Sequence, residues 1–523
     1  MDEPGSQGAL SQPPSVRPWW VLVTLCWSLL VIGLNTTGIN TAIGVIAEDF
    51  EMSTTAVAWA VNAYLLAAAT TVAAGGQFGD VLGRRRMFVI GLGLFAVGSA
   101  TIAAAPGPEV LVAGRAFQGM ASGLMLPAQL ALVRLVFPEA KQGTAVGIWA
   151  ATASFTFAVG PLYGGAFADT VGWRWLFAAD LLLLAVGGVL AWLFLLPVRE
   201  RVSGARPDLV GAASLGVATI AAIVVLQQGG SWGWTGPLTL GVAVLGIASG
   251  VVFVLAEART DDPLVHFSLF RSRAYSAGVI TTFAQGFGLM GLLYFVSIFT
   301  ESAATYDLSA LDAGLVLVPG GLVMFMAALV GGRVADRVGY RVPNTVAMVL
   351  GGIGALALAA TVEPATSTTS LALVATITAA GVGIGFSTTS AAGMVAVPSA
   401  VSGEAAGVIN MSRYVGTVLV VAVGTVLYTQ VAQDRLDDDL GPLGVSSSEE
   451  LSVDRAMGQS AGELQKAVDA LPESEQSEVT AAVRSASVDG FRWAEAMIGL
   501  VLLAAAVASW VLLGTRRGES VEA

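Results

Sequence analysis

The sequence predicts an all-α integral membrane protein with 14 transmembrane helices. Of its 523 residues, 55% are hydrophobic and only 12% are charged, whereas soluble domains average about 25% charged. The apolar residues gather in runs of the length that a helix needs to cross a bilayer, roughly 20 residues. The 63 glycines suit helices that pack closely in lipid. We therefore expect lipid to solvate much of the surface.

Polar, charged, Pro or Gly breaks separate the apolar runs. The predicted spans are Trp19–Thr41, Val57–Gly79, Met87–Ala105, Val110–Val133, Gly143–Ala168, Trp173–Leu195, Val210–Leu226, Pro237–Ala256, Tyr275–Thr300, Ala313–Gly331, Pro343–Thr361, Leu371–Val395, Ala405–Tyr428 and Arg492–Leu513. Residues 1–18 are polar and Pro-rich, so we interpret the first span as a retained helix that follows a short tail.

The rare residue types argue against several functions. Cys26 is the single Cys, which excludes an intrachain disulfide, and His266 is the single His, which argues against His-rich metal sites. Lys141 and Lys466 do not lie in a phosphate-binding glycine loop, so an ATP-driven pump is not expected. We expect no metal, no cofactor and no nucleic-acid partner. The expected partners are a small-molecule substrate and the lipid bilayer, and the chain is expected to be a monomer.

The positive charges predict the orientation. Arg17, Arg84, Arg199, Arg271 and Arg516 are representative of the basic residues, nearly all of which fall on one side of the spans. Since basic loops stay in the cytoplasm, both termini, 1–18 and 514–523, are predicted to be cytoplasmic, in a bacterial cell membrane. The segment 430–490, which carries most of the net charge of −12, is predicted outside. It is interpreted either as a partly ordered solvated loop or as short surface helices at Ser448–Leu471 and Glu473–Ser487.

A repeated motif indicates two homologous halves. Residues 76–85 and 332–341 both read G-x-x-x-D-x-x-G-x-R, each after a span and on the predicted cytoplasmic side. The shared residues are Gly76, Asp80, Gly83 and Arg85, followed by Gly332, Asp336, Gly339 and Arg341. Glycines permit a tight turn, and the Asp could form a clasp with Arg, here Arg84 or Arg337, or with a helix N-terminus across the interface of the halves. Basic turns without a clasp are the alternative.

These residues resemble the major facilitator superfamily, and within it the fourteen-helix drug–proton antiporters, over nearly the whole chain. The resemblance implies two six-helix halves, 19–195 and 257–513, with two extra helices inserted at 196–256. Arg115 and Gln118 in the fourth span are similar to the R-x-x-Q-G motif, whose Arg is linked in the family to proton transfer. A buried ion-pair anchor is the alternative role for this Arg. Val81 departs from the family, where Arg or Lys is usual.

The fifth span resembles the motif that marks exporters. It carries Gly160, Pro161, Gly164 and Gly165. Because Pro weakens the helix ladder and glycines give a smooth face, this segment is expected to bend and to pack tightly against the opposite half. The resemblance therefore implies export.

One departure concerns the energy source. The family has an Asp where this chain has Asn35, and Asn cannot titrate, although Asn35, Thr36 and Asn40 still offer hydrogen bonds to a substrate. In the sixth span the exchange is reversed, since Asp180 stands where Asn is usual. We hypothesise that Asp180, or Glu301 near the outer end of the ninth span, takes the coupling role. The alternative is that Asp180 merely pairs with Arg174 at the outer surface.

A second intramembrane arginine, Arg413, lies in the thirteenth span, where snorkelling or capping is as plausible as a role in the transport path. Together these features predict a secondary transporter that exports small amphipathic or lipophilic compounds such as drugs, antibiotics or toxins, through proton antiport with alternating access. The alternative is an exporter of an endogenous metabolite or lipid precursor that is not proton-coupled.

Two other classes fit less well. The segment 229–233 matches G-x-S-x-G, but a nucleophile elbow needs a strand–turn–helix context and a nearby base. The chain is therefore not expected to be an enzyme. A sensor on a transporter scaffold would need a signalling domain, for which neither terminus has room.

Overall fold

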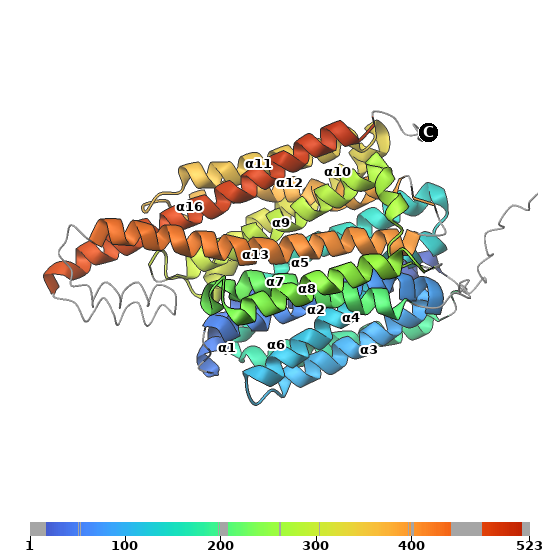
Figure 1. The fold of residues 1–523 in the computed structure, drawn as a ribbon, viewed down its shortest axis with the longest axis horizontal. Helices are drawn as coiled ribbons and strands as arrows, with labels where there is room; N and C mark the ends of the chain where they lie inside the picture. The colour runs from blue at the N-terminus through green and yellow to red at the C-terminus, as the bar shows by residue number, and fades with distance from the viewer. Residues whose placement is uncertain are drawn as a thin grey trace, which may run out of the picture.

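The fold is described from a computed structural model, which places residues 17–50, 52, 54–196, 198, 208–260, 263–302, 304–395, 397–398, 402–440 and 473–514. Over these residues the chain is helical and contains no strand. The described part includes 14 helices that are long and apolar enough to cross a membrane, which confirms the predicted fold class (Figure 1).

The helices follow one another with short connections. They are α1 (Pro18–Asp49), α2 (Thr54–Leu82), α3 (Arg84–Ala103), α4 (Pro108–Val136), α5 (Glu139–Thr170), α6 (Trp173–Leu190) with a π-helical end η1 (Ala191–Leu195), α7 (Leu209–Trp232), α8 (Pro237–Glu257), the 3₁₀ turn η2 (Phe267–Arg271), α9 (Arg273–Glu301), α10 (Ala310–Val338), α11 (Arg341–Thr361), α12 (Thr368–Met394), α13 (Ser402–Leu440) and α16 (Glu473–Leu512).

The same helix pairs form in two bundles. In the first, α1 packs on α5, while α4 packs on both α2 and α3. In the second, α9 packs on α13, while α12 packs on both α10 and α11. The bundles meet along α2 with α13 and along α5 with α10. This pairing relates α1–α6 to α9–α16 in order, as the sequence repeat predicts.

The repeated motif has the same backbone conformation in both bundles. Gly83 has φ 106° and Gly339 has φ 83°, a region that L side chains rarely adopt, and each ends one helix and precedes the next. A close helix contact lies one residue before each motif. A Cβ on Gly75 would lie 2.4 Å from the Gly123 carbonyl oxygen, and one on Gly331 would lie 2.9 Å from Ser387 Oγ.

The inserted pair lies at the seam between the bundles. α7 packs on α8 and also contacts α2 and α13, and the side-chain oxygen of Gln77 accepts a hydrogen bond from the backbone of Asp208 at 2.9 Å. α8 is apolar on all sides and mostly exposed, as expected for a helix that faces lipid.

The segment 430–490 differs from the predicted loop. α13 continues to Leu440 and α16 already begins at Glu473, so both ends of the segment are helical extensions of the spans (Figure 1). Arg435 bridges the two helices, with Asp439 at 3.3 Å and Asp489 at 3.5 Å. The window Glu473–Ser487 is therefore helical but continuous with the span. The window Ser448–Leu471 lies outside the described residues.

Candidate functional site

A cavity of about 120 Å³ lies between the two bundles. The first bundle contributes side chains from α1, α2, α4 and α5, and the second contributes side chains from α9, α12 and α13. Its polar lining residues are Thr36, Thr37, Asn40, Tyr64, Trp149, Thr156, Asn410, Arg413, Tyr414 and Thr417, and Phe386 with aliphatic residues completes the wall. An apolar cavity with a few fixed polar groups is typical of a small-molecule site.

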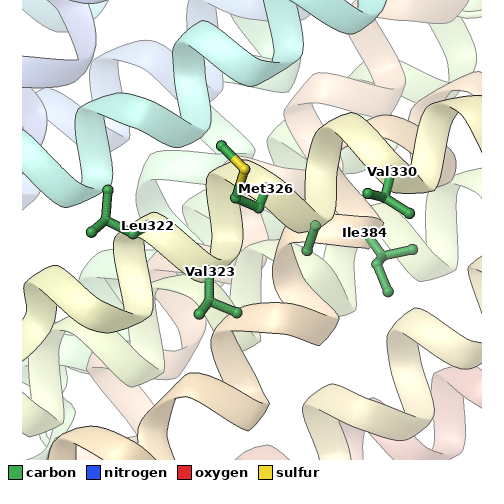
Figure 2. Close-up of a pocket in the computed structure, with 6 residues that line it drawn as sticks. Leu322, Val323, Met326, Val330 and Ile384 are labelled. Carbon is green, nitrogen blue, oxygen red and sulfur yellow. The ribbon is translucent and has the colours of Figure 1, made fainter.

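A second hollow has a different character. Figure 2 shows it between α10 and α12, where Leu322, Val323, Met326, Val330 and Ile384 line it. Its volume is about 430 Å³, but every lining residue is aliphatic or Met, and three of them are about half exposed. Nothing in this hollow could orient a polar substrate, so the central cavity is the better candidate site.

Behind the first bundle's cavity wall lies a buried polar cluster. Arg115 Nη1 donates to Asn35 Oδ1 at 2.6 Å and to Gln118 Oε1 at 2.9 Å. Asn35 Nδ2 in turn donates to Asp180 Oδ2 at 2.7 Å. Gln118 Nε2 donates to Ser99 Oγ at 2.9 Å, and Ser99 Oγ lies 3.5 Å from Asp180 Oδ2. α1, α3, α4 and α6 thus supply one closed network.

This cluster is shielded from the cavity by Tyr64. The Arg115 guanidinium lies 4.5 Å from the centre of the Tyr64 ring, and the Tyr64 hydroxyl bonds Ser122 Oγ at 2.7 Å. Arg115 Nε donates to the Ala60 carbonyl at 3.1 Å. Asn35 and Asp180 are 0% exposed and Arg115 is 1% exposed. A cation and a carboxyl group therefore share a site closed to bulk solvent, with an amide between them.

The alternative placement of Asp180 at the outer surface is wrong. Arg174 instead pairs with Asp49 at 2.7 Å and donates to the Ala105 carbonyl at 3.3 Å. Asp180 is six residues beyond Arg174, which is nearly two turns further along α6. Its side chain is buried in the interior of the bundle.

The predicted site residues separate into three places. Thr36, Asn40 and Arg413 line the cavity, whereas Asn35, Arg115, Gln118 and Asp180 form the cluster behind it. Asn35, which was expected to offer hydrogen bonds to a substrate, instead bonds Arg115 and Asp180 in this structure and does not line the cavity. Glu301 ends α9, near Asp169 of α5, and belongs to neither group.

The exporter-type motif of α5 packs mainly within its own bundle. A Cβ on Gly160 would lie 1.6 Å from Thr37 Oγ1, and one on Gly164 would lie 1.9 Å from the Gly38 carbonyl oxygen of α1. Gly165 is buried beside them. Pro161 meets the opposite bundle, about 3.2 Å from the position of a Cβ on Gly314. The predicted tight contact with the opposite half is therefore seen at Pro161, while Gly160 and Gly164 are closest to α1.

The motif carboxylate Asp80 makes its ion pair within the turn. Arg84 Nη2 lies 2.7 Å from Asp80 Oδ1, one helical turn away. Glu404, at the start of α13, is close enough to repel Asp80 electrostatically. In the second copy, Arg341 stacks on Trp510 at 4.1 Å, and Arg337 is exposed. The pair between Asp80 and Arg84 joins two residues of the same motif copy, and the clasp across the halves stays a prediction.

Other chemistry lacks a site among the described residues. No group of three His, Cys, Asp or Glu side chains could hold a metal ion there. The G-x-S-x-G segment lies at the end of α7, with Gly233 at φ 80° as its cap, and not on a strand–turn–helix elbow.

Sequence reasoning missed two residues at the cluster and one buried carboxyl group outside it. Ser99 completes the cluster and Tyr64 shields it, and the sequence analysis assigned neither of them a role at the site. Glu495 of α16 is 0% exposed, and neither carboxyl oxygen has a hydrogen-bond partner among the described residues. A carboxyl group three residues inside a predicted span was a usable signal for Glu495.

Two bundles of related topology around a cavity, with ionisable groups buried in the helices, define the class of secondary transporters. The chain belongs to the Major Facilitator Superfamily, whose family model matches residues 25–421.

Curated relatives have resistance and export roles in their names. The chain is 31% identical over 334 residues to the tetracenomycin C resistance and export protein of Streptomyces glaucescens, which covers 64% of this chain and 62% of that protein. It is 33% identical to the puromycin resistance protein of Streptomyces alboniger, covering 69% and 71%. It is 30% identical to the multidrug resistance protein Stp of Mycobacterium tuberculosis, covering 78% and 75%.

Solved structures share the fold. The proton:xylose symporter XylE superposes with a TM-score of 0.58 at 14% identity, covering 94% of this chain and 95% of that one. The human organic anion transporter MFSD10 superposes with a TM-score of 0.55 at 16% identity, covering 94% and 100%. These likenesses establish only the fold of this chain.

Proposed function

We propose that this protein is a proton-driven exporter of drug-sized amphipathic compounds, and that Asp180 is the carboxyl group that couples proton entry to export. The observation that carries the proposal is the 2.7 Å contact between Asn35 and Asp180. The two positions that exchange Asn and Asp relative to the resembled family face each other. The carboxyl group has therefore moved from α1 to α6 while staying within the same buried cluster.

The cluster supplies the parts of a proton switch. Burial away from bulk solvent disfavours the charged carboxylate, and the nearby Arg115 cation favours it. Asn35 bonds both groups, so a small movement of α1 against α4 or α6 would change the balance between these two effects. Tyr64 lies between the cluster and the cavity, and its ring contacts the Arg115 guanidinium. Binding in the cavity can thus alter the cluster through Tyr64.

The relatives support the direction and the kind of substrate. Their names associate them with resistance to tetracenomycin C, puromycin or several drugs. Energetically, one charge moved through 100 mV is worth about 2.3 kcal/mol, enough for a roughly fiftyfold gradient of solute. Without a titrating group, the same scaffold would only equilibrate a toxin. We also place the protein in the bacterial cell membrane with both termini cytoplasmic, as its arginines favour.

The test compares Asp180→Asn with the double variant Asn35→Asp/Asp180→Asn in proteoliposomes with an imposed pH gradient. Tetracenomycin C, puromycin and a lipophilic cation serve as test solutes. With a pH gradient worth the same roughly 2.3 kcal/mol per proton as 100 mV, Asp180→Asn should lose gradient-driven accumulation, from roughly fiftyfold towards none, while retaining exchange of solute at equal pH. The double variant returns a carboxyl group to the cluster and should restore accumulation.

Asp307→Asn is the matched control. Asp307 is exposed in the loop before α10 at φ 50°, a conformation that Asn also tolerates, so this variant should behave like the unaltered protein. Full gradient-driven transport by Asp180→Asn would contradict the assignment of Asp180. If no transported solute responds to the pH gradient in the unaltered protein, proton antiport itself is wrong.

A further inference from the structure

Arg413 of α13 is a cation in the wall of the central cavity. Its Nη2 donates to Ser390 Oγ at 2.8 Å, and its Nη1 lies 3.5 Å from Asn410 Oδ1. The guanidinium lies 5.2 Å from the centre of the Phe386 ring. Both hydrogen-bond partners are neutral. The positive charge therefore lies within the membrane-spanning part of the protein, and the described contacts do not neutralise it.

Among the residues that the structure describes, no carboxylate pairs with this cation. The residues that line the cavity include no Asp or Glu, and Arg413 forms no ion pair among the described residues. Its Nε is buried and lacks a hydrogen-bond partner. A charge within a membrane-spanning helix is normally paired, because leaving it unpaired there is unfavourable. Arg413 thus has an unmet requirement for an acceptor, preferably an anion.

Arg115, which is 1% exposed, provides an internal comparison with the partly buried Arg413. Arg115 bonds Asn35, Gln118 and a backbone carbonyl, and Asp180 lies next in the same network. It lies behind Tyr64 and does not line the cavity. The same protein therefore surrounds one intramembrane arginine with acceptors and leaves the other incompletely bonded at the site where a solute would bind.

Close packing of α9 on α13 fixes the backbone from which the Arg413 side chain extends. A Cβ on Gly286 of α9 would lie 2.3 Å from the Arg413 carbonyl oxygen and 2.9 Å from its Cγ, so α9 and α13 approach very closely at this point. Asn410, Arg413, Tyr414 and Thr417 form one helical stripe towards the cavity. This packing positions the guanidinium before any solute binds, which lowers the cost of binding.

We propose that the cavity binds an aromatic weak acid in its anionic form, with a carboxylate or phenolate oxygen accepting hydrogen bonds from Arg413. The ring of the solute would lie among Tyr64, Trp149 and Phe386, which line the same cavity. This inference rests on the proposed export function, since it names the substrate class of the same site. A lipophilic cation would instead meet a like charge and no counter-ion.

Three naphthalene probes of similar shape and different charge test the proposal. They are 2-naphthoate, the neutral 2-naphthamide and the cation 2-naphthyltrimethylammonium, and binding to the purified full-length protein is measured by titration calorimetry. A charge-assisted hydrogen bond in a desolvated site should favour naphthoate over naphthamide by roughly tenfold or more. The cation should bind more weakly than the amide.

Variants locate the effect. Arg413→Gln should reduce naphthoate affinity to that of naphthamide and leave naphthamide binding intact, which also reports that the cavity remains folded. Arg413→Lys retains the charge but loses the planar fork, so it should retain only part of the preference. Arg333→Gln removes an exposed cation of α10 that lies outside the cavity, and it should change none of the three affinities.

Some outcomes would overturn the proposal. Equal affinities for the three probes in the unaltered protein, absent binding of all three, or a preference for the cation would each do so. A preference for naphthoate that survives in Arg413→Gln would also overturn it. If Arg413→Gln fails to fold, the order of the affinities for the three probes in the unaltered protein and in Arg413→Lys decides whether the proposal stands. Because equilibrium binding needs no proton gradient, these results stay separate from failure of the antiport assay.

Discussion

The contact between α1 and α5 should be the least tolerant of added volume. In Gly164→Ala, the new methyl carbon would lie 1.9 Å from the Gly38 carbonyl oxygen and 2.5 Å from Thr41 Oγ1. Since a backbone oxygen cannot rotate away, the two helices must separate by about 1 Å in a densely packed interior. Thr41 Oγ1 also donates to the Pro161 carbonyl at 3.0 Å, and this bond opposes the separation. We expect a loss of about 1–3 kcal/mol.

The loss of stability should differ among substitutions along the contact between α1 and α5. Gly160→Ala would meet Thr37 Oγ1 at 1.6 Å, but that hydroxyl can rotate, and the nearest fixed atom is Thr37 Cβ at 2.8 Å. Gly160→Ala should therefore cost less than Gly164→Ala despite its shorter first contact. Gly44→Ala is the control on α1, because nothing lies within 4 Å of its Cβ and Ala is favoured over Gly in a helix by roughly 0.5–1 kcal/mol.

Thermal unfolding of the purified variants in one detergent, followed by tryptophan fluorescence, measures the order. The expected apparent melting temperatures fall from Gly44→Ala through the unaltered protein and Gly160→Ala to Gly164→Ala. Transport should fall in the same order, because Pro161 joins this face to Gly314 of the other bundle. An unchanged melting temperature for Gly164→Ala would refute the inferred close packing of α1 and α5.

Two further substitutions probe local features of the second bundle. Glu495→Leu should raise the apparent melting temperature, since removing a buried carboxyl group without hydrogen-bond partners relieves a desolvation penalty of about 1–3 kcal/mol; a lower melting temperature would indicate an unrecognised partner. Gly339→Ala should cost about 1–3 kcal/mol through backbone strain alone, because its φ is 83° with ψ 174° and nothing lies within 4 Å of its Cβ; stability equal to that of the unaltered protein would contradict that conformation.

The features that the sequence predicted well are local or repeated. Each apolar run is long enough to span a bilayer by itself, so the number of spans could be predicted without knowledge of their packing. The repeated motif predicted matching turns because its glycines act on their own backbone, and Gly83 and Gly339 do share positive φ values. The ends of α13 and α16 were missed because hydropathy detects the edge of the lipid and not the continuation of a helix in water.

The candidate site was harder, because it depends on the rotation of each helix. Asn35 and Thr36 are adjacent, yet one faces Asp180 and the other lines the cavity, since consecutive residues point about 100° apart. In a first span that is apolar on every side, no pattern fixes that rotation. The exchange of Asn and Asp between Asn35 and Asp180 could be seen in the sequence, but the contact between them required the fold.

The two proposals together have an energetic consequence. If the solute is a monoanion and one proton enters through Asp180, each cycle moves the equivalent of two positive charges inwards. At 100 mV, inside negative, the potential then supplies about 4.6 kcal/mol per cycle, twice the value for one charge. Exchange of a monocation for one proton would move no net charge and would be driven by the pH difference alone. A cation at Arg413 therefore does more than select the solute, because it determines which part of the proton gradient drives export.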